Sequence, residues 1–318
     1  MKLLVTGCAG FIGANFTKFV LKNYPNDSVV GVDALTYAAN LDALKELKSE
    51  ERFLFYKADI CDETAMNKII DAEKPRVVVN FAAESHVDNS ILNPESFIRT
   101  NVLGTQVLLN ASYRYGVSRF HQVSTDEVYG DVPLESEHIF DECSVLKPSS
   151  PYSASKAAAD LIALSYMRTY GLSVSVSRST NNYGMYQHGE KLIPTVIKKA
   201  MSGIPIPIYG DGKNMRDWLF VEDNCAAIDL IIRKGACEIY NIGSGNLISN
   251  CDLIDRILDC LDIPSARKKF VKDRLGHDMK YAVDCKKIRE LGWKAEADFE
   301  SGLKTTVEWY KTKYCSRI

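Results

Sequence analysis

Several features are missing from this sequence, and each absence narrows the range of functions. None of the nine cysteines forms a C-x-x-C pair and the five histidines show no ligand spacing, so we expect no metal site. No apolar run approaches the roughly 20 residues that a membrane-spanning helix needs. The net charge of -2 comes without a basic stripe, which argues against nucleic acid and membranes as partners.

The cysteines and the first residues predict a cytoplasmic location. Nine scattered cysteines in a chain of 318 residues are typical of reduced, mostly buried thiols. An apolar strand pattern begins at Leu3, and no signal peptide is visible before it. Apolar content of 46% and charged content of 25% are ordinary for a globular protein, and the length predicts roughly two domains.

Short apolar runs alternate with longer helical patterns in the first half of the chain. Continuous β-branched runs separated by helices indicate a parallel sheet that is covered on both faces. The fold class is therefore α/β, a Rossmann-type doubly wound parallel sheet with a smaller α/β C-terminal lobe. The predicted strands cover residues 2–6, 28–33, 53–57, 77–81, 120–124 and 173–177, and the predicted helices lie near residues 11–23, 62–73, 95–115 and 152–170.

The pattern becomes less regular from about residue 180, where Gly, Pro and Asn interrupt it. Helices are expected to resume near residues 190–202, 222–234, 250–262 and 299–313. We place a domain boundary near residue 178. Residues 1–178 would form a dinucleotide-binding domain that also holds the catalytic residues, and residues 179–318 a substrate-binding lobe.

A glycine-rich turn after the first predicted strand indicates a dinucleotide site. Gly7, Gly10 and Gly13 allow a tight turn and let backbone N–H groups approach a pyrophosphate at a helix N-terminus. Asp33 ends the second strand about twenty residues further on, where a carboxylate binds a ribose diol and repels a 2′-phosphate. The pattern therefore favours NAD over NADP.

Further cofactor contacts are expected along the same edge of the sheet. Asp59 has an alternative role as the N-cap of the next helix. Ala82 and Ala83 have side chains small enough for close packing against the dinucleotide. The predicted contacts are Phe11, Ile12, Asp59, Ile60, Ala82, Ala83, Tyr152 and Lys156.

Two other patterns predict the chemistry. Asp126 and Glu127 are neighbouring carboxyl groups just after an apolar segment, while Tyr152 and Lys156 lie four residues apart on one helix face. A lysine ammonium and a positive nicotinamide ring would lower the pKa of a tyrosine. The tyrosine can then remove a hydroxyl proton while the nicotinamide takes the hydride, and the adjacent acid and base can remove water. We therefore expect a dehydration driven by a transient oxidation.

With these motifs the chain resembles the extended short-chain dehydrogenase/reductases and, within them, the dTDP-glucose 4,6-dehydratase family. The run Thr125-Asp126-Glu127 discriminates best, because related epimerases share the nicotinamide machinery without this acid pair. The matching segments span most of the chain: Gly7–Gly13, Phe81–Asp88, Ser124–Gly130, Tyr152–Lys156, Asn181–Gly184, Glu190–Pro194, Tyr209–Gly212, Arg216–Trp218 and Asp273–Asp278.

The resemblance implies a role for each reacting group. Tyr152 would deprotonate the C4 hydroxyl of a nucleotide-linked hexose, expected to be dTDP-glucose, and Thr125 would hydrogen-bond the C4 oxygen. Glu127 would remove the C5 proton, and Asp126 would donate a proton to the departing C6 hydroxyl. The implied substrate contacts are Ser85, Asn182, Lys191, Leu192, Pro207, Tyr209, Arg216, Asn246 and Arg274.

Departures from the family pattern leave the substrate open. They cluster around the expected nucleotide-sugar pocket, so UDP-glucose and UDP-N-acetylglucosamine remain alternatives, the latter with inversion at C5. A nucleotide-sugar 4-epimerase and a catalytically silent dinucleotide-binding protein also remain as hypotheses. The departures are Cys8, Asn89, Met185, His188-Gly189 and Ser244-Gly245.

Two helical segments carry apolar residues on more than one face. A second apolar stripe, beyond the one that covers the sheet, would let the chain pair with a copy of itself. The resemblance implies a homodimer joined by such a four-helix contact, and the alternative is a monomer with a wide core face. The residues concerned are Val107, Leu108, Leu109, Leu161, Ile162 and Leu164.

Overall fold

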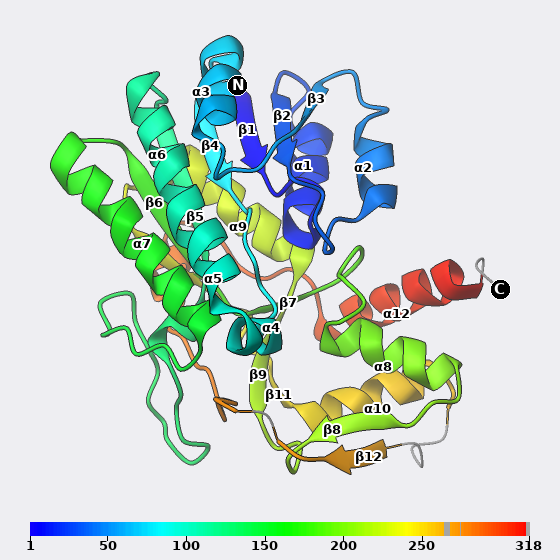
Figure 1. Ribbon diagram of the computed structural model, residues 1–318. Helices are drawn as coiled ribbons and strands as arrows, with labels where there is room; N and C mark the ends of the chain where they lie inside the picture. Colours follow the sequence, from blue (N-terminus) through cyan, green and yellow to red (C-terminus); the bar gives the residue numbers. More distant parts are fainter. Residues whose placement is uncertain (264–267, 274, 316–318) are drawn as a thin grey trace.

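A seven-stranded parallel sheet organises the computed structural model, which describes residues 1–263, 268–273 and 275–315 (Figure 1). The strand order is β10-β6-β5-β4-β1-β2-β3, and every neighbouring pair is parallel. This order contains the arrangement 3-2-1-4-5-6 of dinucleotide-binding folds, so the predicted fold class is confirmed. The strands are β1 (Lys2–Thr6), β2 (Ser28–Asp33), β3 (Phe53–Lys57), β4 (Val77–Asn80), β5 (Arg119–Thr125), β6 (Val174–Ser179) and β10 (Ile239–Ile242).

Helices cover both faces of this sheet, as the continuous apolar strands require. On one face α1 (Phe11–Asn23), α2 (Leu41–Leu47) and α9 (Val221–Lys234) pack against alternate residues of β1, β2 and β4. On the other face α3 (Glu63–Glu73), α6 (Thr105–Arg114) and α7 (Pro151–Tyr170) cover the intervening residues.

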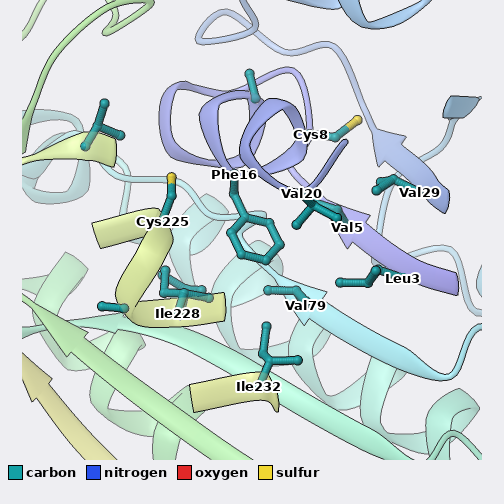
Figure 2. Packing of buried hydrophobic residues seen from close by; sticks show 14 of the residues in the cluster. Leu3, Val5, Cys8, Phe16, Val20, Val29, Val79, Cys225, Ile228 and Ile232 are labelled. Atoms are coloured by element: carbon teal, nitrogen blue, oxygen red, sulfur yellow. The ribbon is translucent and has the colours of Figure 1, made fainter. Parts of the chain in front are cut away.

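Phe16 of α1 shows how tightly the first face is packed. Its side chain is fully buried. Figure 2 shows the ring pointing from α1 into a space bordered by Val79 of β4 and by Ile228 and Ile232 of α9. Truncating a phenylalanine at such a position costs about 3–5 kcal/mol, because the cavity adds to the lost transfer free energy.

The part of the chain beyond residue 178 forms the smaller lobe and also contributes a strand and a helix to the larger domain. β10 pairs with β6, and α9 packs against α1. The boundary at residue 178 stays a prediction, but the sheet itself includes a strand from beyond it. The sequence pattern did not reveal β10, because its pairing partner lies about sixty residues away.

The smaller lobe has its own core between three helices and two small sheets. β7 (Asn181–Tyr183) and β11 (Leu247–Ser249) flank β9 (Met215–Phe220), and β8 (Ile206–Tyr209) pairs with β12 (Lys268–Val271). In Figure 1 these elements lie below the main sheet. Its helices are α8 (Leu192–Met201), α10 (Asn250–Cys260) and α12 (Phe299–Cys315), which pack on one another.

Most elements predicted from the sequence agree with the structure to within two residues, and the segment 95–115 is the main exception. It is divided into α5 (Pro94–Phe97), a π-helix η1 (Ile98–Gly104) and α6. Short elements without a clear sequence signal complete the chain: α4 (Val87–Leu92), the 3₁₀-helix η2 (Asp126–Tyr129) and α11 (Lys286–Glu290). No helix in the described part of the chain is long and apolar enough to span a bilayer.

Candidate active site

The carboxyl ends of the parallel strands bring the predicted site residues to one edge of the main sheet. β1 ends at Thr6, β2 at Asp33 and β5 at Thr125, and predicted functional groups lie at or just after each of these strand ends. The strand order reverses between β1 and β4, which is where ligands bind in open α/β sheets. The fold therefore gathers the cofactor and reaction motifs at one edge of the sheet.

The glycine turn after β1 is held very close to β4. Gly7 has φ +65°, and an added Cβ would lie 2.8 Å from the backbone nitrogen of Ala82. An added Cβ at Gly13 would lie 2.2 Å from the carbonyl oxygen of Gly7, so any side chain there would displace the turn. Cys8 fits in place of the family glycine because its side chain is fully buried, pointing toward Gly31 of β2.

Asp33 lies beside this turn. One of its carboxylate oxygens accepts a hydrogen bond from the backbone N–H of Ala9 at 2.9 Å, and the other from Leu35 at 2.8 Å. Burial raises the pKa of Asp33, and these two hydrogen bonds oppose the rise. Each oxygen keeps a second lone pair for a ribose hydroxyl.

The other predicted cofactor residues lie around the same turn with different surroundings. Phe11 and Ile12 begin α1, and Ala82 and Ala83 follow β4 as half-buried residues. Ile60 is buried in the core. Asp59 does not cap α3, because Asp62 is the N-cap, and its carboxylate instead accepts from the backbone N–H of Cys61.

The residues present fit an NAD molecule. The N-cap of α1 is Gly10, no side chain caps this helix, and its first turn contains no acidic residue. The orphan N–H groups of the first turn are therefore open to a pyrophosphate, which the helix dipole also favours. The small residues after β4 and the carboxylate of Asp33 complete a surface suited to an adenosine diphosphate.

The surroundings of Asp126 favour its protonated form. Its side chain is 2% exposed, its Oδ1 receives a hydrogen bond from Thr125 at 3.2 Å, and its Oδ2 has no partner within the described chain. Burial raises the pKa of Asp126 well above its usual value, and the charges of Glu127 and Asp217 raise it further. Glu127 is only partly buried. The two neighbouring carboxyl groups therefore lie in different environments, as an acid and a base at one pH require.

Tyr152 meets this pair from the start of α7. The neighbouring carboxyl groups of Glu127 and Asp126 and a hydrogen bond with Thr125 all act on its hydroxyl group. Burial is the largest cause, and together with the two carboxyl groups it raises the pKa of Tyr152. This differs from our expectation that Lys156 lowers that pKa, because burial and the nearby acids outweigh a lysine directed elsewhere.

Lys156 is oriented by the end of β5. Its buried Nζ donates a hydrogen bond to the carbonyl oxygen of Val123 at 2.6 Å. Burial lowers the pKa of Lys156 to about 8, and the charge of Asp160 opposes the fall. The ammonium form therefore still predominates near neutral pH, and the side chain ties α7 to the strand that carries the acid pair.

The smaller lobe supplies Arg216 to this centre. Its guanidinium donates to the carbonyl oxygens of Met215 and Asp278, both at 2.8 Å, and lies 4.5 Å from the centre of the Tyr281 ring. Its charge lowers the pKa of Asp126. Asn246 lies in a turn whose backbone N–H groups bond to Asp217.

Of three other substrate candidates, Ser85 and Lys191 contact each other and Asn182 lies in β7. Lys191, the N-cap of α8, donates a hydrogen bond from Nζ to the carbonyl oxygen of Ser85 at 2.8 Å. Asn182 is buried, and its Nδ2 donates to Thr180 at 2.8 Å. Its Oδ1 has no partner within the described chain, which leaves an acceptor for a ligand.

The remaining substrate candidates lie farther along the smaller lobe. Leu192 begins α8, and Pro207 and Tyr209 share the outer face of β8, alternating with buried isoleucines. Tyr209 is 41% exposed, as a surface for stacking requires. Arg274 lies outside the described residues.

Sequence reasoning missed two residues of this centre. The hydroxyl group of Tyr281 donates to Asp278, and its pKa is raised by burial and then by the charge of Glu127. Asp217 accepts hydrogen bonds from the turn at residues 244–246 and also influences Asp126. Asp217 follows Arg216 directly, so its position was a usable signal, whereas nothing local marks Tyr281.

Comparisons with known proteins agree with this geometry. The family model described as GDP-mannose 4,6 dehydratase matches residues 4–306. The dTDP-glucose 4,6-dehydratase of Shigella flexneri is 48% identical over 335 residues, covering 98% of this chain and 92% of the relative. The structure is similar to that of DesIV, a dTDP-glucose 4,6-dehydratase from Streptomyces venezuelae solved with NAD bound, with a TM-score of 0.95, 43% identity and coverage of 99% and 98%.

A related enzyme of different activity shares the fold. The UDP-glucose 4-epimerase of Thermotoga maritima, solved with UDP-glucose, matches with a TM-score of 0.92 and 30% identity, covering 99% of this chain and 100% of that one. The fold alone therefore does not separate dehydration from epimerisation, and the residues of the site have to decide.

Proposed function

Because this chain belongs to the GDP-mannose 4,6-dehydratase family, we propose that it is an NAD-dependent nucleotide-sugar 4,6-dehydratase acting on dTDP-glucose. The product is the 4-keto-6-deoxy sugar, and the net change is the loss of one water. The enzyme is accordingly a hydro-lyase, although its cofactor is that of an oxidoreductase.

One observation carries the proposal. Asp126, a buried carboxyl group with a raised pKa, lies beside Glu127 and within electrostatic reach of Tyr152. A 4-epimerase needs a tyrosine and a nicotinamide but no second acid–base pair, because it never breaks the C6–O bond. The residues of this site therefore favour dehydration over epimerisation.

The side chains act in a fixed order on the hexose. Tyr152 takes the proton of the C4 hydroxyl, with Thr125 bonded to the same oxygen. The C4 ketone makes the C5 hydrogen acidic, so Glu127 can remove it as a proton. Asp126 gives its proton to the C6 hydroxyl, which leaves as water, and a proton then returns to C5.

NAD, when bound, supplies a hydride acceptor at C4, a hydride donor at C6 and a positive ring near Tyr152. Gly7, Gly10 and Gly13 would hold its pyrophosphate and Asp33 its adenine ribose. The secondary contacts would be Phe11, Ile12, Asp59, Ile60, Ala82, Ala83, Tyr152 and Lys156.

The substrate contacts remain part of the proposal. Arg216 would approach the diphosphate, because a guanidinium makes forked, charge-assisted bonds to phosphate oxygens. Pro207 and Tyr209 would bracket the base. The remaining contacts would be Ser85, Asn182, Lys191, Leu192 and Asn246, with Arg274 carried over from the sequence prediction alone.

The decisive experiment presents the protein with dTDP-glucose, UDP-glucose and UDP-N-acetylglucosamine in the presence of NAD. We expect the product of dTDP-glucose to be lighter by one water in mass spectrometry, with the fastest turnover of the three. NMR coupling constants report the C5 configuration. Epimerised sugar without loss of mass, or no product from any donor, would disprove the proposal.

The assembly proposed is a homodimer joined through α6 and α7. Our sequence prediction of the stripe needs correction, because Val107, Leu108 and Leu109 are buried in the chain's own core. Leu161 of the predicted stripe is exposed, whereas Ile162 and Leu164 are partly buried against the same core. The other large apolar residues exposed on these helices and on η1 are Ile98, Leu103, Tyr113 and Tyr170. The cytoplasmic location expected from the nine unpaired cysteines stays a prediction.

A further inference from the structure

A buried polar network lies beneath the candidate active site and has no part in the reaction proposed above. Its centre is Arg178 of β6, whose side chain is 2% exposed. The Nε of Arg178 donates to Asp160 Oδ2 at 3.0 Å, and Nη1 donates to the hydroxyl oxygen of Tyr129 at 2.9 Å. The Tyr129 hydroxyl in turn donates to Asn241 Oδ1 at 2.7 Å.

The two partners of Arg178 belong to the two elements that carry the reacting groups. Asp160 lies one helical turn after Lys156 on α7, the helix whose second residue is Tyr152. Tyr129 ends η2, the 3₁₀-helix that begins with Asp126. One planar guanidinium therefore fixes the distance between the Tyr–Lys helix and the acid–base turn.

A buried arginine between two such elements is an unusual choice for stability alone. Desolvating an ion pair costs several kcal/mol, and packed apolar residues of similar volume are often equally stable. The rigid fork of the guanidinium instead fixes direction, which two apolar side chains would not do. The reaction needs this precision, because one hexose has to meet Tyr152 at C4 and the acid pair at C5 and C6.

We propose that Arg178 is a positioning residue with two separable arms: the arm to Asp160 serves the oxidation at C4, and the arm to Tyr129 serves the elimination of water. The assignment rests on the proposed dehydratase function. Asp160 holds the Lys156 end of α7, so losing this arm disturbs Tyr152. Tyr129 holds η2, so losing that arm disturbs Asp126 and Glu127.

The charges of the network agree with this arrangement. Burial raises the pKa of Tyr129 to about 12, so its hydroxyl stays protonated and donates to Asn241. Burial raises the pKa of Asp160, while the charges of Arg178 and Lys156 oppose the rise. The groups that face Asp160 are Lys156 on its own helix, Arg178 on β6 and Ser124 on β5.

The test separates the two steps in a single turnover of dTDP-glucose with the NAD-loaded protein. Absorbance of reduced nicotinamide follows the oxidation, and mass spectrometry of quenched samples follows the loss of water. In Tyr129→Phe, which removes one oxygen, we expect oxidation within about twofold of the unaltered rate and water loss about tenfold slower, so reduced nicotinamide accumulates. In Asp160→Asn we expect oxidation about tenfold slower and no accumulation.

The control is Tyr240→Phe, which removes the hydroxyl group of a buried tyrosine on β10. Within the described chain, this hydroxyl oxygen accepts one hydrogen bond, from the backbone N–H of Ala236. It should leave both steps unchanged. NAD affinity by calorimetry should be unchanged in all three variants, and circular dichroism reports their folding. If Asp160→Asn does not fold, Asp160→Glu takes its place, because it keeps the charge but shifts it by one methylene.

Two results would overturn the assignment. One is folded Tyr129→Phe protein that loses water at the unaltered rate. The other is an equal slowing of both steps in both variants, as expected for a purely structural network. Failure of the unaltered protein to release water from dTDP-glucose would instead disprove the proposed function, and the assignment with it.

Discussion

Asp126 shows how one residue acquires its chemistry from its surroundings. A carboxyl group that is buried beside another carboxyl group has a raised pKa, because both effects disfavour its charged form. Asp126 is such a carboxyl group, because its pKa is raised by burial, then by Glu127 and then by Asp217. Thr125 and Arg216 oppose the rise, so the acid remains able to release its proton when the C6–O bond breaks.

Replacing Asp126 by Asn should slow the loss of water by a factor of about 10²–10⁴, the usual contribution of a general acid. The amide has the same shape but has no acidic proton to give. Oxidation at C4 should be nearly unaffected, so reduced nicotinamide should accumulate and be visible as absorbance. Unchanged dehydration in this variant would assign the proton donor to another group.

Tyr152→Phe tests the opposite half of the reaction. The Phe97 ring meets the Tyr152 ring edge-on at 6.3 Å between centroids, and phenylalanine preserves that contact. Turnover should fall by a factor of about 10²–10⁴ because the C4 proton has no acceptor, while nucleotide-sugar affinity by calorimetry persists. Near-normal turnover would remove Tyr152 from the mechanism.

At the scale of single residues, the sequence predicts the site residues that are neighbours along the chain. It does not predict those that reach the site only through the fold. The pairs Asp126 with Glu127 and Tyr152 with Lys156 are visible because adjacency and helical spacing are local. Tyr281 reaches the same centre from more than 120 residues away, and no local pattern marks it. Its position results from the return of the chain across the smaller lobe.

β5 contains a buried titratable group, His121, that makes stability depend on pH. His121 is fully buried, with Nδ1 2.9 Å from Ser175 Oγ and Nε2 3.0 Å from Ser177 Oγ, both on β6. Burial, and then the charge of Arg119, lowers the pKa of His121 from 6.5 to about 3. The folded state therefore holds the neutral ring, whereas the unfolded chain protonates near its ordinary pKa.

The sign follows from linkage. The contribution of His121 to stability is complete above about pH 6.5 and is lost as the pH falls toward about 3. At about pH 4.5 the loss is roughly 2–3 kcal/mol. Denaturant unfolding at several pH values should show His121→Asn losing less stability on acidification than the unaltered protein. Parallel curves for the two proteins would contradict this account.

The segment 95–115 shows where helical periodicity fails at the scale of an element. The pattern predicts one helix, but the structure inserts the π-helix η1. Asn101 in η1 is buried, with Nδ2 donating to Ser155 Oγ at 2.8 Å and Oδ1 accepting from the backbone N–H of Glu84 at 2.9 Å. These contacts to α7 and to the turn after β4 are long-range, so periodicity could not predict them.

At the scale of the molecule, the loop after β7 links the two lobes around the site. Tyr186 accepts a hydrogen bond from Lys18 of α1 at 2.6 Å, and its ring packs against Trp309 of α12 at 4.9 Å. Asn15 of α1 donates to the carbonyl oxygen of Met185 in the same loop. The alternation of strands and helices predicted the strands of the main sheet except β10, but contacts between lobes have no counterpart in local sequence.

The assembly can be tested on the exposed apolar residues of α6 and α7. Leu161 is 59% exposed near the middle of α7, and Tyr113 and Tyr170 lie ring against ring at 5.1 Å near the ends of the two helices. A two-fold pairing of these helices would bury them all in a four-helix contact. An aspartate at position 161 would place two like charges in that contact, so Leu161→Asp should be monomeric where the unaltered protein is dimeric.

Light scattering after size exclusion measures the mass of each form. Val145→Asp is the matched control, because Val145 is 72% exposed in the loop between η2 and α7 and should leave the dimer intact. Both substitutions replace solvent-exposed side chains, so the unfolding free energy of each folded chain should change by no more than about 0.5 kcal/mol. A monomeric unaltered protein would contradict the proposed dimer. A Leu161→Asp variant that remains dimeric would rule out α6 and α7 as the interface, because a buried apolar contact between these helices would not tolerate two added charges.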